Sequence, residues 1–192
     1  MLDSYLKNEI LLTENELKLS ESNLVIMSSK EDELMRESAE ILKPKNKIVL
    51  NVGFGLGIID TYIRNHGPKE HHIIEAHPQV CEKAQEMGFE VHCGKWEEVI
   101  RGFIETGKTF DAIYFDTYVF DYKTNPQWAP FTRLVPRLLS KGGTYSYFNN
   151  IAAKVEGVEG IVQEFGWKRN SKDLKHPFDS KPYTLVWFTK TT

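Results

Sequence analysis

The feature that most constrains this chain is a regular alternation between short apolar runs and segments with helical periodicity. The apolar runs have the length of buried strands and lie at residues 47–54, 71–76, 90–94, 110–116 and 143–150, with two further candidates at 167–173 and 182–190. Helices are predicted at residues 58–65, 79–87, 96–105, 132–139 and 155–165. Such alternation is typical of βαβ units. The sequence therefore predicts an α/β fold with a mostly parallel sheet.

The chain is expected to form one domain, residues 1–192. Its 192 residues, of which 41% are hydrophobic, can bury one core, and no repeat or linker interrupts them. Residues 1–45 precede the first strand candidate, and two stretches of it, 5–19 and 28–42, are interpreted as helices. Residues 46–192 would form the sheet-containing part.

The composition argues against several kinds of partner. The 24 basic residues are dispersed among 27 acidic ones, so the net charge of −3 gives no general attraction for nucleic acid or for an anionic membrane surface. No apolar run approaches the roughly 20 residues of a membrane helix, and the N-terminus lacks the order of a secretory signal. We expect a cytoplasmic protein, with the nucleus as the alternative location, and the sequence leaves a monomer and a homodimer open.

Cysteine and histidine spacing indicates no disulfide and no metal site. Cys81 and Cys93 lack a CxxC spacing, so reduced thiols are expected. The six histidines give no metal signature either, because His71 and His72 open a strand candidate and His77 and His92 lie far from any HxxxH partner.

A glycine-rich turn, GFGLGI at residues 53–58, follows the first strand candidate. Glycine has no Cβ, so such a turn brings backbone amides and a helix N-terminus close to a ligand. Glu75 ends the second strand candidate about twenty residues later, where a carboxylate can accept hydrogen bonds from ribose hydroxyls. The two features together favour a nucleoside cofactor over a purely structural turn. The GxGxG spacing differs from the GxGxxG of pyrophosphate binders, which favours S-adenosylmethionine over NAD.

Four motifs in order, VGFGLGI, IIEAHP, GKWEEV and FDAIYFDTY, resemble the guanidinoacetate methyltransferases and the related fungal protein-arginine δ-N-methyltransferases. The resemblance covers roughly residues 25–149 and includes Met27, Glu31 and Met35 at the family's Met-x3-Glu-x3-Met spacing. On a helix this spacing places the three side chains on one face. The resemblance implies the seven-stranded sheet of class I methyltransferases, mostly parallel with one antiparallel strand near the C-terminal edge, with helices on both faces and an N-terminal helical segment at the active site.

The resemblance also implies a site for S-adenosylmethionine, with S-adenosylhomocysteine as the product. Glu31 would grip a substrate guanidinium, and Asp116 would be the second catalytic carboxylate. The residues implied on the cofactor side are Met27, Met35, Gly53, Phe54, Gly55, Leu56, Gly57, Ile58, Glu75, Ala76, His77, Lys95, Trp96 and Asp116.

Two carboxylates suit this chemistry. A guanidinium has delocalised lone pairs and a pKa above about 12, so it cannot lose its proton beforehand at neutral pH. Paired carboxylates can bind the N–H groups of the planar guanidinium and accept its proton as the new bond forms. They also offset the repulsion between the cationic guanidinium and the cationic sulfonium of the donor. The plainer alternatives are that Glu31 is a solvated acid in the run KEDE and that Asp116 caps a turn; Asp121 is the reserve carboxylate.

The loop after the fourth strand candidate is aromatic, with Tyr118, Phe120, Tyr122 and Trp128. These side chains could cover a guanidinium through cation–π contacts or could pack on the core.

Two departures from the family pattern bear on the acceptor. Lys30 stands where a tryptophan often precedes the substrate glutamate, and Ile151-Ala152 replaces the Thr-Ser pair that receives the carboxylate of guanidinoacetate. IIEAHP is more similar to the arginine-modifying branch. We therefore expect arginine, free or in a protein, with guanidinoacetate as the alternative. A dinucleotide-dependent oxidoreductase and a catalytically silent binding module are the competing functions.

Overall fold

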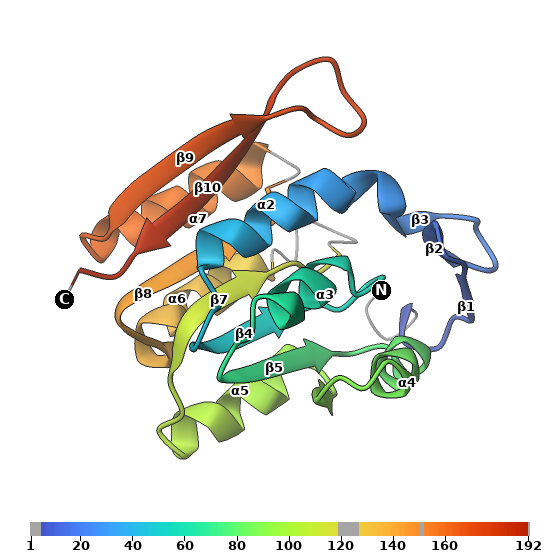
Figure 1. Cartoon of the computed structure of the whole chain (residues 1–192), viewed down its shortest axis with the longest axis horizontal. Coiled ribbons are helices and arrows are strands. Elements are labelled where there is room, and N and C mark those ends of the chain that lie inside the picture. The colour runs from blue at the N-terminus through green and yellow to red at the C-terminus, as the bar shows by residue number, and fades with distance from the viewer. Residues whose placement is uncertain (1–4, 119–126, 150–151, 192) are drawn as a thin grey trace.

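The computed structural model describes residues 5–118, 127–149 and 152–191 (Figure 1). At its centre lies a seven-stranded sheet with the order β6-β5-β4-β7-β8-β10-β9. The strands are β4 (Ile48–Val52), β5 (Glu70–Glu75), β6 (Val91–Cys93), β7 (Phe110–Phe115), β8 (Leu139–Tyr147), β9 (Lys168–Leu174) and β10 (Tyr183–Thr189). β10 is antiparallel to both of its neighbours, and the other pairs are parallel. The predicted sheet, with one antiparallel strand near the C-terminal edge, is confirmed.

Helices cover both faces of this sheet (Figure 1). One layer holds α2 (Asp32–Leu42), α3 (Ile58–Asn65) and α4 (Pro78–Glu86), and the other holds α5 (Trp96–Glu105), α6 (Trp128–Leu138) and α7 (Ala152–Glu164). Successive strand residues point to opposite faces, so Val49 packs in the first layer's core and Leu50 in the second. Strands buried on both sides explain the continuous apolar runs of the sequence.

Within the described ranges, no helix combines the length and the apolar character that crossing a bilayer requires.

The N-terminal segment differs from the prediction of a helix at residues 5–19. It forms an antiparallel sheet of β1 (Ile10–Leu12), β2 (Glu16–Leu19) and β3 (Val25–Ser28), which lies beyond the carboxyl ends of the parallel strands (Figure 1). The Thr13 hydroxyl accepts hydrogen bonds from the amides of residues 15 and 16, which closes a tight turn. In β2, buried Leu17 and Leu19 alternate with partly exposed neighbours. This period of two, and not a helical period, was the local signal.

The helix predicted at 28–42 is confirmed from Ser29 onward, as a short 3-10 turn, Ser29–Glu31, that leads into α2. Ser28 and Glu31 form a capping box. The Ser28 hydroxyl accepts a hydrogen bond from the Lys30 amide at 3.4 Å, and the Glu31 carboxylate accepts one from the Ser28 amide at 3.1 Å. Met27 lies in β3, paired with Leu17, and not on the helix. The expectation that Met27, Glu31 and Met35 share one helical face was therefore wrong.

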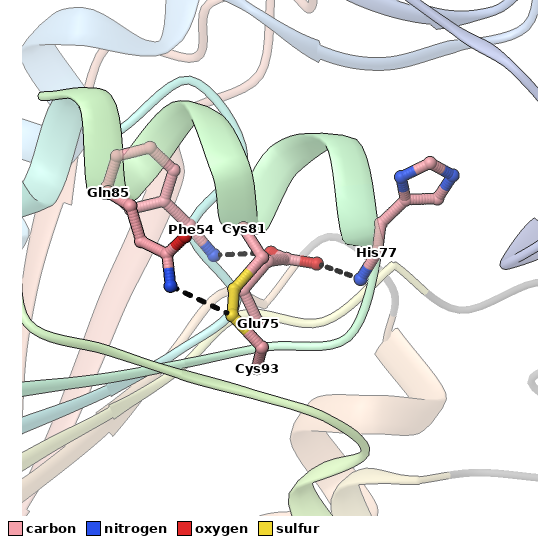
Figure 2. Close-up of a disulfide and its surroundings, with 6 residues drawn as sticks. All are labelled: Phe54, Glu75, His77, Cys81, Gln85 and Cys93. Atoms are coloured by element: carbon pink, nitrogen blue, oxygen red, sulfur yellow. Dashed lines mark hydrogen bonds between the residues drawn. A yellow bond between two sulfur atoms is a disulfide. The ribbon is translucent and has the colours of Figure 1, made fainter.

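Cys81 and Cys93 form a disulfide (Figure 2), which corrects the expectation of two reduced thiols. Cys81 lies on α4 and Cys93 ends β6, and their Cα atoms are 5.8 Å apart. The packing of α4 against β6 creates this proximity, which a separation of 12 residues without a CxxC spacing does not indicate.

Candidate functional site

A cavity of about 470 Å³ lies where β4, β5 and β7 end. Its floor includes the glycine turn, Glu75 and Asp116, and its walls come from β3, the start of α2 and the loop between β9 and β10. Ligands of open α/β sheets bind at this edge because the carboxyl ends of the parallel strands leave a crevice there. The cavity is thus the candidate active site.

The glycine turn approaches its neighbours too closely for side chains. A Cβ on Gly53, which has a φ of 98°, would lie 1.9 Å from the backbone oxygen of Asp116. A Cβ on Gly55, with a φ of 57°, would lie 2.4 Å from the sulfur of Met27. The Leu56 amide donates a hydrogen bond to this sulfur at 3.2 Å. At Gly53 both the fixed backbone of Asp116 and the positive φ require glycine, whereas at Gly55 the positive φ favours glycine and a side chain would also displace Met27.

A buried polar network supports the turn from below. The Asn51 side-chain amide donates to the Gly53 carbonyl at 2.9 Å and to the Asp60 carboxylate at 2.9 and 3.0 Å. Asp60 is fully buried on α3 and also bonds to the His71 ring at 2.9 Å. This network was not predicted from the sequence, where a polar Asn51 inside an apolar strand run was the available signal.

Glu75 joins the glycine turn to the segment that follows β5 (Figure 2). Its carboxylate oxygens accept hydrogen bonds from the amides of Phe54, at 2.9 Å, and His77, at 2.7 Å. Burial raises the pKa of Glu75 above its ordinary value, and these backbone hydrogen bonds oppose the rise. Glu75 lines both the main cavity and a smaller one of about 60 Å³, which Lys95 and Trp96 also line.

Glu31, which ends the 3-10 turn before α2, and Asp116, which follows β7, both line the main cavity. Glu31 is only 7% exposed, and its carboxylate accepts a hydrogen bond from the Ser28 amide at 3.1 Å. Burial, and secondarily the nearby charge of Asp116, raise the pKa of Glu31 to about 7. Burial also raises the pKa of Asp116 to about 6, where Lys154 opposes the rise and Asp60 adds to it. Two carboxyl groups with pKa values near neutral can exchange protons with a bound substrate.

Lys154 was not singled out from the sequence. It is fully buried, and its ammonium lies 5.9 to 6.0 Å from the ring centroids of Phe115, Tyr147 and Phe148. Burial lowers the pKa of Lys154 to about 8, while Asp116 acts in the opposite direction. The ammonium therefore serves as a counter-charge on the protein side of Asp116.

The aromatic lining of the main cavity comes mainly from the C-terminal half of the chain. Phe148 and Tyr183 stack with their ring centroids 5.9 Å apart, and His176 lies 5.9 Å from Tyr183. Phe178, on the same loop as His176, also lines the cavity and is 57% exposed. No motif in the sequence identified these residues, because only the packing of β10 beside β8 brings them to the site.

The predicted aromatic loop is only partly described. Tyr118 lines both cavities, whereas Trp128 is 8% exposed and packs against α7, where a Cβ on Gly157 would lie 2.2 Å from its ring. Phe120, Asp121 and Tyr122 lie outside the described residues, as does Ile151.

The predicted cofactor residues fall into three sets, two that line a cavity and one that does not. Met27, Gly53, Phe54, Gly55, Glu75 and Asp116 line the main cavity, and Ala76, Lys95 and Trp96 line the smaller one. The residues that lie outside both linings are Met35, Leu56, Gly57, Ile58 and His77. Met35 is fully buried in the core beneath the cavity, whereas the sequence placed it beside the cofactor. The His77 ring forms a hydrogen bond with the Asn8 carbonyl at 2.9 Å, and the His77 backbone amide donates to Glu75.

Comparison with known sequences identifies relatives of this chain. The sequence model of the guanidinoacetate N-methyltransferase family matches residues 10–157. Protein arginine N-methyltransferase 2 of Yarrowia lipolytica is 36% identical over 183 positions, which cover 84% of this chain and 38% of that protein. The protein of the same name from Emericella nidulans is 34% identical over 155 positions, which cover 78% of this chain and 36% of that protein. The chain thus spans less than two fifths of the length of these curated relatives.

Comparison of structures places the fold among the class I methyltransferases. The magnesium protoporphyrin IX methyltransferase of Synechocystis, solved with bound SAM, superposes with a TM-score of 0.62 at 8% identity. The match covers 84% of this chain and 80% of that one. At this identity the likeness concerns the fold alone.

Glu31→Gln should stabilise the protein above neutral pH. Because the folded state raises the pKa of Glu31 from 4.5 to about 7, stability falls as pH rises through this interval. The amide stays neutral and should raise the free energy of unfolding by about 1–3 kcal/mol at about pH 8, with the gain shrinking toward about pH 5. Denaturant unfolding at both pH values measures the difference. Glu33→Gln, at an exposed position of α2, is the matched control; an equal gain for Glu31→Gln at both pH values would contradict the prediction.

Proposed function

The chain belongs to the guanidinoacetate N-methyltransferase family, and from this premise we propose that it transfers a methyl group from S-adenosylmethionine to a guanidino nitrogen of arginine. The observation that carries the proposal is the convergence of Glu31 and Asp116, both with raised pKa values, on one cavity beside the glycine turn.

The residues at the glycine turn fit an adenosyl ligand. Gly53 and Gly55 leave their backbone open to the cavity, and Glu75 lines it with a carboxylate that accepts one backbone hydrogen bond at each oxygen. A carboxylate oxygen has two lone pairs, so Glu75 can still accept from two ribose hydroxyls. Lys95 and Trp96 line the adjoining smaller cavity, which would take the base. When bound, S-adenosylmethionine would supply an electrophilic methyl group and, as the bond from its sulfur to that carbon breaks, would keep the electron pair and leave as S-adenosylhomocysteine.

Glu31 and Asp116 would bind and activate the acceptor. A cationic guanidinium between them would lower both pKa values and favour the ionised carboxylates, which hold its N–H groups in paired hydrogen bonds. As the nitrogen forms its bond to carbon, it loses a proton, and one of the two carboxylates receives it at an oxygen atom. Water then takes this proton when the product leaves. Without substrate the two pKa values are about 7 and about 6, so binding of a guanidinium would shift both groups at neutral pH to the ionised form that can accept a proton.

Arginine is the acceptor that the proposal favours over guanidinoacetate. The two fungal relatives are named protein arginine N-methyltransferase 2. In addition, Lys30 and Ile151-Ala152 depart from the pattern of the guanidinoacetate enzymes. A protein arginine reaches an active site through a long apolar stem, which the aromatic rings of Phe148 and Tyr183 could pack against.

The first test separates the cofactor from the acceptor. S-adenosylmethionine and S-adenosylhomocysteine should raise the melting temperature in proportion to saturation, because each binds the folded state, whereas NAD and NADP should not. Labelled S-adenosylmethionine is then offered with free arginine, guanidinoacetate and arginine-bearing proteins. Stabilisation by NAD alone would reject the methyltransferase assignment, and labelling of guanidinoacetate alone would reject arginine.

Removing either carboxylate should affect turnover far more than cofactor binding. We expect Glu31→Gln and Asp116→Asn each to lower turnover by roughly 10²–10⁴-fold, because each variant loses a proton acceptor and one of the two negative charges that bind the guanidinium. The double variant should lose less than the product of both factors, since the two residues hold one group. Steady-state methyl transfer and calorimetric binding of S-adenosylhomocysteine measure the two effects. A parallel collapse of binding and turnover would mean that these residues maintain the fold of the site.

Lys154→Met should move the acid limb of the pH profile to higher pH. The ammonium lowers the pKa of Asp116, and the ionised carboxylate is needed to bind a guanidinium, so activity is lost as pH falls through this pKa. Without Lys154 the pKa of Asp116 rises to and beyond that of Glu31, which sets the upper end of the limb, so the limb of kcat/KM should shift up by about 0.3–1 pH unit. Lys168→Met, at an exposed position at the start of β9, is the control and should leave the profile unchanged. An unshifted limb in Lys154→Met would remove the lysine from the electrostatics of the site.

A further inference from the structure

A second group of polar side chains lies on β5 and β6, on the sheet face that α5 covers. His72 on β5 and His92 on β6 stack with ring centroids 5.4 Å apart, and His72 Nδ1 lies 3.1 Å from His92 Nε2. The Glu90 carboxylate approaches His72 Nδ1 at 3.7 Å. One ligand atom from each of the three residues lies within 4.8 Å of the others.

These separations match the coordination of a small divalent metal ion. With zinc-to-nitrogen bonds of about 2.0–2.1 Å, tetrahedral ligand atoms lie about 3.3–3.4 Å apart. The observed 3.1 and 3.7 Å bracket this value. Two imidazoles and a carboxylate are ligands that Zn²⁺ accepts readily.

An outer carboxylate already orients the central histidine. Glu70 accepts a hydrogen bond from His72 Nε2 at 3.0 Å, and Lys108 in turn binds Glu70. In a neutral imidazole with its proton on Nε2, the other nitrogen, Nδ1, carries the free lone pair, and it faces His92 and Glu90. Metal-binding histidines are typically oriented by such a second carboxylate.

We propose that His72, Glu90 and His92 form a binding site for Zn²⁺ or a similar divalent transition metal. The ion replaces the hydrogen bond between the two rings and fastens β6 to β5. β6 has only three residues and lies at the edge of the sheet, so its position depends on few backbone hydrogen bonds. The next residues, Gly94 and Lys95, line the smaller cavity, and the site therefore stabilises one wall of it. This proposal does not depend on the methyl-transfer reaction.

The test titrates zinc chloride by calorimetry into the untagged chain of residues 1–192, in a buffer without reductant or chelator. We expect one equivalent to bind with a Kd below about 100 µM and to raise the melting temperature. Ring-nitrogen NMR should show His72 Nδ1 and His92 Nε2 shifting on addition of Zn²⁺. Glu70→Gln should weaken binding by about 10–100-fold, because it removes the orienting carboxylate and no direct ligand.

Two ligand variants and one control decide the assignment. His92→Gln should abolish high-affinity binding of zinc, and Glu90→Gln should weaken it. Because the Glu90 side chain is 68% exposed, its replacement should not disturb folding. His66→Gln is the matched control. His66 lies outside the cluster, and its Nε2 atom is 3.1 Å from the carboxylate of Glu40. A Kd above about 100 µM for the unaltered protein, or high-affinity binding that survives both ligand variants, overturns the proposal.

Discussion

The candidate site depends on how closely the backbone packs where three parallel strands end together. Gly53 follows β4 and lies between β5 and β7. Its amide donates a hydrogen bond to the Ile74 carbonyl at 2.8 Å, and the carbonyl of the preceding residue, Val52, accepts one from the Asp116 amide at 2.8 Å. No side chain fits at Gly53, because its Cβ would overlap the Asp116 carbonyl. The strand pairing thereby fixes Asp116 and Glu75 on two sides of one glycine turn before any ligand binds, and a site ordered in advance loses little freedom on binding.

The electrostatics of the cavity oppose the stability of the fold. Glu31 and Asp116 are held close enough for the charge of one to raise the pKa of the other, and both lose hydration. Buried charges of the same sign destabilise a folded protein unless something offsets them. Lys154 offsets part of the charge of Asp116 from inside, and a cationic substrate would offset the rest from the cavity. The arrangement is therefore best balanced when a cation occupies it, which is why these carboxylates suggest a binding site and not a structural ion pair.

The sequence predicted those parts of the fold that depend on local periodicity. The continuous apolar runs became β4 and β7, and the helical spacing at 58–65 and 96–105 gave α3 and α5 with the predicted bounds. The N-terminal three-stranded sheet was mistaken for a helix because the period of two extends over only three or four residues in each strand, which makes it a weak signal. Glu31 and Asp116 were found through family motifs, which carry information that periodicity lacks.

What the sequence did not predict depends on strand register, which no local pattern encodes. In the pairing of β5 with β6, Ile74 lies opposite His92 and Glu75 opposite Cys93. Because alternate residues face opposite sides, this single register directs His92 toward His72 and α5, and Cys93 toward Cys81 and α4. A slip of one residue would reverse both directions and separate both pairs. The disulfide and the histidine cluster therefore have one structural origin, and both constrain the strand that leads into the smaller cavity.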